Sequence, residues 1–144
     1  MKRIIKELLA ISGVLSMSIR RKMNRGEKVV LNYHHIVPDE LVEANLFYGY
    51  THSLSHFKEQ ISFLDREFGF STDLKDTSRI TLTFDDGGLS NFTNVLPVLH
   101  ELDIQALFFV SDLPPAKTFW FEEWYAWFTY APAKKYSFQQ LEID

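Results

Sequence analysis

Residues 80–110 carry the stretch that decides the fold, ITLTFDDGGLSNFTNVLPVLHELDIQALFFV. The stretch opens with β-branched and aromatic residues, which favour a strand, and the letters DDGG then favour a turn. We therefore predict a strand at 80–84 that ends abruptly, with Asp85 and Asp86 at its carboxyl end.

The residues after this turn predict a helix and a second strand. The run ALFFV at 106–110 suits a parallel strand that is buried on both faces. Pro97 fits the helix only if a short first turn precedes the main part. Strand, crossover helix and parallel strand form a right-handed βαβ unit, whose strand tips are where α/β folds place catalytic groups. The apolar residues on one side of the predicted helix, within 91–102, are Phe92, Val95, Leu96, Leu99 and Leu102.

Composition limits the class of protein. With 144 residues, of which 46% are hydrophobic, the chain is long enough for one packed domain or part of one. It has no cysteine, which excludes disulfides, a thiolate zinc site and a cysteine nucleophile. Any transition metal must therefore be held by histidine and carboxylate. Eight of the 15 lysines and arginines lie in the first 28 residues, so the acidic remainder argues against nucleic-acid binding.

The first 25 residues predict a basic amphipathic helix. A signal peptide is the rival interpretation, but serines and Gly13 interrupt the apolar stretch, and that stretch is too short to span a bilayer. The helix is expected either to pack on the domain, the commoner case, or to rest on an anionic membrane surface. We accordingly expect an N-terminal helix at 1–27, an α/β domain at 28–144, and a cytoplasmic or membrane-peripheral location, with secretion as the alternative.

Two adjacent histidines follow the next predicted strand, at 28–32. His34 and His35 could be metal ligands or residues of an active-site rim, because imidazole binds zinc and strand tips face the active site in barrel folds. The alternative is one buried hydrogen-bonding histidine and one in a surface loop. Residues 38–50 are expected to form a loop.

A second histidine pair, His52 and His56, has the spacing of a helical metal site. The apolar periodicity that follows places a helix start at Ser53 or Ser55, with Gly69 as the stop. His52 would then lie outside the helix and His56 in its first turn. We therefore predict a structural helix start, not a metal site.

The segment 119–130 is dense in aromatic residues and is expected to be helical from Glu122. Its rings could form a platform for sugars, but a buried face is the commoner reason for such a stripe. Residues 131–144 are polar and irregular.

Two adjacent carboxylates at one strand tip repel each other. A divalent metal relieves this repulsion by binding one of them and leaves the other free to accept a proton. This arrangement suits attack by metal-activated water on an amide or ester carbonyl. The letters DDG alone, however, are as typical of a plain turn.

A longer pattern surrounds these letters: YHHI at 33–36, TFDDG at 83–87, Asn91, Pro97, Leu99, ALFFV at 106–110 and FWFEEW at 119–124. This pattern resembles the polysaccharide deacetylase family, the NodB-homology carbohydrate esterases, over about three-quarters of the chain from Val29 onward. The resemblance implies the N-terminal portion of a distorted (β/α) barrel, and hydrolysis of N-acetyl or O-acetyl groups on sugars with zinc or a similar divalent metal.

The resemblance assigns roles to three residues. Asp85 matches the catalytic base, Asp86 matches the metal-binding aspartate, and His34 matches a supporting residue of the active-site rim. The family's other two metal ligands are histidines beyond the FFV strand, whereas this sequence has no histidine after Val110. We therefore expect part of a longer deacetylase, or a truncated product of one, with little or no activity by itself.

Two classes of function follow. The first is a metal-dependent hydrolase of carbon–nitrogen or ester bonds in an acetylated polysaccharide, with a small non-sugar amide as another substrate within the fold. The second is a non-catalytic remnant that binds a glycan or a partner through its aromatic segment. Neither involves nucleic acid, and residues 1–25 are the candidate for peripheral membrane contact.

Overall fold

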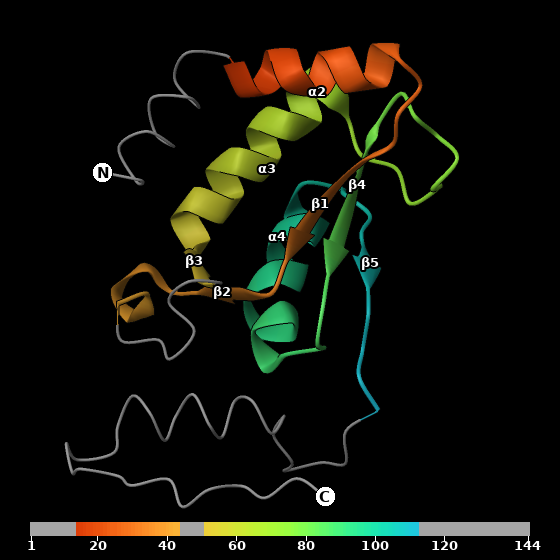
Figure 1. Ribbon diagram of the computed structural model, residues 1–144. Coiled ribbons are helices and arrows are strands. Elements are labelled where there is room, and N and C mark those ends of the chain that lie inside the picture. Colours follow the sequence, from red (N-terminus) through yellow and green to blue (C-terminus); the bar gives the residue numbers. More distant parts are fainter. Residues whose placement is uncertain (1–13, 44–50, 113–144) are drawn as a thin grey trace, which may run out of the picture. The chain divides into compact units, whose positions relative to one another are not determined.

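The computed structural model describes residues 14–43 and 51–112, and those up to Ser111 belong to one compact unit. Its centre is a three-stranded parallel sheet in the order β1, β4, β5 (Figure 1). Strands β1 (Val29–Tyr33) and β4 (Ile80–Phe84) pair along their whole length. The predicted strand at 80–84 is confirmed, and the one predicted at 28–32 is confirmed to within one residue.

The last strand differs from its prediction. β5 covers only Leu107–Phe108, and beyond it Phe109 and Val110 are 55% and 65% exposed. The prediction of a strand at 106–110 that is buried on both faces was therefore wrong, because the strand is shorter and its last residues are more exposed than predicted. The reason is its position, because within the described residues β5 has only β4 as a neighbour and forms an edge of the sheet.

Helices α3 (Leu54–Phe68) and α4 (Leu96–Glu101) supply much of the hydrophobic core. Because side chains alternate along a strand, Leu82 and Phe84 of β4 pack into that core while Thr81 and Thr83 face the other way. The core residues that are buried include Tyr33, Ile36, Phe57, Ile61, Leu82, Phe84, Val95, Val98, Leu99 and Ile104.

The start of α3 agrees with the prediction. Ser53 is its N-cap, with the side-chain oxygen accepting a hydrogen bond from the backbone N–H of His56, and Gly69 ends the helix with φ of 67°. Not predicted was the strand just before it, β3 (Thr51–Ser53), which pairs in parallel with β2 (His35–Val37) in a second, two-stranded sheet.

The crossover between β4 and β5 begins with a π-helical turn, η3 (Asn91–Val95), and continues as α4. The backbone N–H of Leu96 donates to the carbonyl of Asn91, five residues back. Pro97 explains the wide turn, because its ring would clash with the carbonyl four residues earlier in a regular α-helix. The predicted helix with a distinct first turn before Pro97 is confirmed.

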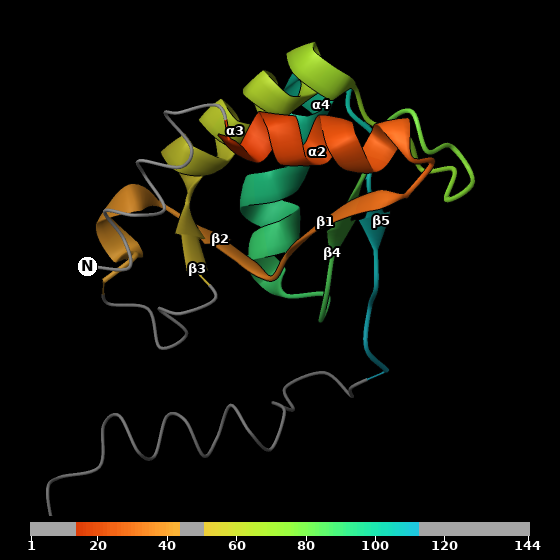
Figure 2. The same ribbon diagram turned by 45° about the horizontal axis from the view of Figure 1, so that its top comes forward.

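Helix α2 (Val14–Asn24) packs against the C-terminal end of α3 (Figure 2). Arg20 donates from Nη2 to Glu67 Oε2 at 2.6 Å, and its guanidinium lies 5.0 Å from the centre of the Phe68 ring. None of the described helices is both long and apolar enough to cross a membrane. Membrane contact and the division at residue 27 stay predictions. Residues 1–13, 44–50, the aromatic segment 119–130 and the tail 131–144 lie outside the described residues.

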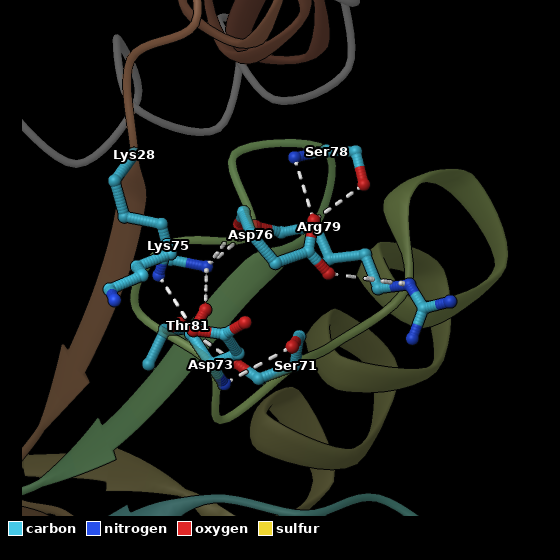
Figure 3. Close-up of polar contacts among 8 residues, drawn as sticks. All are labelled: Lys28, Ser71, Asp73, Lys75, Asp76, Ser78, Arg79 and Thr81. Atoms are coloured by element: carbon cyan, nitrogen blue, oxygen red, sulfur yellow. Dashed lines mark hydrogen bonds and ion pairs between the residues drawn. The ribbon is translucent and has the colours of Figure 1, made fainter.

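The loop before β4 is organised around the ammonium group of Lys28 (Figure 3). Lys28 Nζ donates to the backbone carbonyls of Asp73, Asp76 and Arg79 at 3.2, 2.6 and 3.1 Å. The carboxylates of Asp73 and Asp76 accept in turn from the backbone N–H groups of Lys75 and Ser78. These bonds join the residue before β1 to the loop that leads into β4, at the end of the strands opposite Asp85.

Candidate active site

Asp85 is the first residue after β4, at the carboxyl end of the sheet. Its backbone N–H donates to the carbonyl of Tyr33 at 3.1 Å, which continues the β1–β4 pairing past the end of the strand. Its carboxylate Oδ2 accepts from Asn32 Nδ2 at 2.7 Å and lies 3.7 Å from His34 Nε2. The side chains of Asp85 and His34 are 35% and 34% exposed, so the pair is accessible from solvent.

Asn32 is a residue of this site that was not predicted from the sequence. It lies in β1 directly opposite Thr83 of β4, and Thr83 Oγ1 donates to Asn32 Oδ1 at 2.9 Å. The signal that could have revealed it is strand alignment, because pairing 29–33 with 80–84 places a lone polar residue of β1 beside the end of the TFDD strand.

Asp86 and Gly87 make the turn that follows. Both have a left-handed backbone, with φ of 70° and 65°. A Cβ atom on Gly87 would lie 2.8 Å from Val110 Cγ1, so this position is restricted to glycine by space as well as by conformation. A non-glycine residue at positive φ stores strain, which is often found at functional sites. Within the described part of the chain, the Asp86 carboxylate accepts no hydrogen bond.

Two asparagines hold the surrounding backbone. Asn91, fully buried, donates from Nδ2 to the carbonyl of Asp85 at 3.3 Å, and Asn94 donates to the carbonyl of Ile36 at 2.7 Å. The Tyr33 hydroxyl donates to Gln60 Oε1 of α3 at 2.7 Å. Burial raises the pKa of this hydroxyl above its ordinary range. The segments 33–36 and 83–87 are thereby fixed relative to each other.

The residues that the structure describes contain no group of three or more histidine, aspartate or glutamate side chains that could hold a metal ion. Asp86 and the two histidines of the YHHI segment therefore do not make a complete site by themselves. Gly88 lies close to this segment, since a Cβ atom there would be 3.7 Å from His35 Nδ1.

His52 and His56 do not share a helical face, as predicted. His52 lies in β3, where its ring meets the Tyr33 ring edge-on at 5.2 Å between centres, and His56 lies in the first turn of α3.

Because of this separation, we expect the double variant His52→Ala, His56→Ala to bind zinc with the same affinity as the wild-type chain. Isothermal titration calorimetry measures this affinity, and circular dichroism confirms that the variant is folded. A drop in affinity of tenfold or more would show that the two histidines act together as ligands.

The comparison with protein families agrees with the sequence pattern around Asp85. Residues 73–120 match the sequence model of the family described as polysaccharide deacetylase, so the match begins after the YHHI segment and is narrower than expected. Among solved structures, IcaB from Ammonifex degensii is 29% identical, with a TM-score of 0.44 over 57% of this chain. The chain spans only 37% of that protein's length. The search of curated proteins found no significant match to this chain.

Proposed function

We propose that this chain belongs to a polysaccharide deacetylase and that its chemistry is the hydrolysis of acetyl groups on N-acetylated or O-acetylated sugars of a polysaccharide. The proposal is supported by the match of residues 73–120 to the polysaccharide deacetylase family. The observation that carries the proposal is the position of Asp85. It lies inside the matched segment, at the end of a buried strand, with its carboxylate held by Asn32 and partly open to solvent. In this proposal the parallel strands β1, β4 and β5 are the N-terminal portion of a distorted (β/α) barrel.

Asp85 is the residue that we propose as the general base. An ionised carboxylate only accepts hydrogen bonds, so a water molecule beside it must offer its proton to the carboxylate, and loss of that proton makes the water a stronger nucleophile. Attack on the acetyl carbonyl would then release acetate and leave a free amine or hydroxyl group on the sugar. His34, beside Asp85, has a supporting role at the rim.

The family is generally metal-dependent, and Asp86 is the residue that we propose as a metal ligand. Zinc is the ion expected, and it would polarise the acetyl carbonyl and lower the pKa of bound water. The part of the chain described by the structure brings together no set of three ligands, so it does not fit such an ion by itself.

The incomplete set of metal ligands favours a second candidate function, a non-catalytic one. The residues that the structure describes bring together no three histidine, aspartate or glutamate side chains that could hold a metal ion. A non-catalytic remnant that binds a glycan or a protein partner would keep this fold without needing those ligands. For the hydrolase the proposed partner is a polysaccharide or an N-acetylated glycan, and for the remnant it is a glycan or a protein. A cytoplasmic or membrane-peripheral location stays a prediction.

We expect the chain, incubated with zinc and a chromogenic acetyl ester or N-acetylglucosamine oligomers, to show little or no turnover. Any turnover that is measured should fall at least about 100-fold in Asp85→Asn, because the amide cannot take the proton. The control Asp103→Asn makes the same change at an exposed aspartate just after α4, outside the candidate site, and should leave turnover unchanged.

The outcomes separate the two candidates. Turnover that depends on Asp85 supports the hydrolase, whereas stoichiometric glycan binding without turnover supports the remnant. Strong zinc-dependent turnover of the wild-type chain would contradict the expected low activity, and turnover that survives in Asp85→Asn would contradict the role of the base.

A further inference from the structure

Both contacts of the Asp85 carboxylate with described side chains are made by the same oxygen. Asn32 Nδ2 lies 2.7 Å from Oδ2, and His34 Nε2 lies 3.7 Å from it. Oδ1 makes no contact with a described side chain, and 35% of the Asp85 side chain as a whole is exposed to solvent.

The Asn32 amide has a defined orientation. A carboxylate offers only acceptors, so the NH₂ group of Asn32 must face Asp85 and its carbonyl oxygen must face away. That oxygen accepts from Thr83 Oγ1 at 2.9 Å. Thr83 is 5% exposed and β-branched, so its side chain has little freedom to turn. The Thr83 hydroxyl also lies 3.4 Å from the carbonyl oxygen of Leu31, but the Asn32 oxygen is the nearer acceptor. The hydroxyl therefore helps to orient the amide that holds Asp85.

All three residues stand on the paired strands or at their end. Asn32 and Thr83 are direct partners in the β1–β4 register, and the backbone N–H of Asp85 continues that pairing to Tyr33. Groups fixed on strands are held more precisely than groups on loops, and a side chain that supports a reactive residue is most effective there.

We infer that Asn32 is a positioning residue for the proposed base, holding Oδ2 of Asp85 so that Oδ1 takes the proton of the attacking water. The role of Asp85 as a base in this inference rests on the proposed function. The contacts of Asn32 with Asp85 and Thr83 do not depend on it. In the step concerned, an O–H bond of water breaks and its proton bonds to Oδ1. The water oxygen bonds to the acetyl carbon while the π bond of the acetyl carbonyl breaks and its electron pair moves onto the carbonyl oxygen.

The geometry can be tested on the whole chain without turnover, by nuclear magnetic resonance. We expect Asp85 to occupy one χ1 rotamer, seen in the three-bond couplings of its Cγ, and expect a coupling across the hydrogen bond from Asn32 Nδ2 to Asp85 Cγ. In Asn32→Ala this second coupling is lost and the χ1 couplings become averaged. In Thr83→Val, which releases the amide, the coupling across the hydrogen bond weakens.

Matched controls make the same substitutions elsewhere. Asn24→Ala changes an exposed asparagine at the end of α2, and Thr93→Val removes a hydroxyl that donates to the carbonyl of Leu89. Both should leave the Asp85 couplings at their wild-type values. An Asp85 rotamer that is unchanged in Asn32→Ala would overturn the inference, whatever the activity of the chain.

The kinetic arm separates this inference from the proposed function. Where turnover is measurable, Asn32→Ala should lower kcat roughly ten- to 100-fold, the equivalent of one charge-assisted hydrogen bond, with KM nearly unchanged. A wild-type kcat in Asn32→Ala overturns the positioning role. If no turnover depends on Asp85, the proposed function fails, while the rotamer result still decides the geometry.

Discussion

Phe84→Ala is expected to lower the free energy of unfolding by about 3–5 kcal/mol, the usual cost of cutting a buried phenylalanine back to alanine. Phe84 has no exposed surface and is the last residue of β4. Its ring stacks on Phe108 at 4.9 Å between centres and on Tyr33 at 5.9 Å, and it meets Phe57 edge-on at 5.9 Å. The ring thus joins three strands and α3, and Phe84 immediately precedes Asp85 in the chain.

Urea unfolding followed by circular dichroism measures this loss, which is a large share of the roughly 5–15 kcal/mol that stabilises a typical domain. The matched control is Phe63→Ala, because Phe63 is 41% exposed on α3 and contacts the guanidinium of Arg66. We expect that control to cost no more than about 1 kcal/mol. Equal losses in the two variants would contradict the central position of the Phe84 ring.

Lys28→Met is expected to lower the free energy of unfolding by about 1–3 kcal/mol and to loosen the loop at 71–79. Methionine keeps the apolar stem of the side chain but supplies no donor for the carbonyls of Asp73, Asp76 and Arg79, which Figure 3 shows gathered around the ammonium. Lys28→Arg should not keep the wild-type stability. The three N–H groups of an ammonium radiate from one nitrogen toward three separate carbonyls, whereas the donors of a guanidinium all lie in one plane.

Lys75→Met is the matched control, since Lys75 lies in the same loop and only its backbone N–H makes a hydrogen bond with a described residue. Urea unfolding gives the free energies, and the rate of trypsin cleavage after Arg79 reports the opening of the loop. Faster cleavage in Lys28→Met than in Lys75→Met is the expected result. Similar stability and cleavage in both variants would show that the three carbonyls do not depend on Lys28.

Local signals were sufficient for much of the fold. The strand at 80–84, the helix start at Ser53, the stop at Gly69 and the special first turn before Pro97 each depend on a few neighbouring residues, and the structure has all four. The identification of Asp85 and Asp86 as a strand-tip pair was likewise local, because a strand followed by DDGG fixes where the chain turns.

The remainder depended on contacts between distant segments. Strands β2 and β3 are three residues each, too short for a periodic pattern, and exist through their mutual pairing. Asn32 contacts Asp85 across 53 residues, and Lys28 reaches carbonyls 45 to 51 residues away, so both contacts require the β1–β4 register. The burial of 106–110 was overestimated because an apolar run does not reveal whether its strand lies at an edge.

The left-handed backbone at Asp86 decides which substitutions there can be interpreted. Asparagine adopts positive φ more readily than most other residues and has the shape of aspartate, so Asp86→Asn would report the removal of one negative charge. Alanine or valine would remove the charge and, in addition, disfavour the positive φ at this position. The resulting change of backbone conformation would displace Asp85, which is joined to residue 86 by a peptide bond. An inactive Asp86→Ala protein would therefore say as much about a displaced neighbour as about a missing carboxylate.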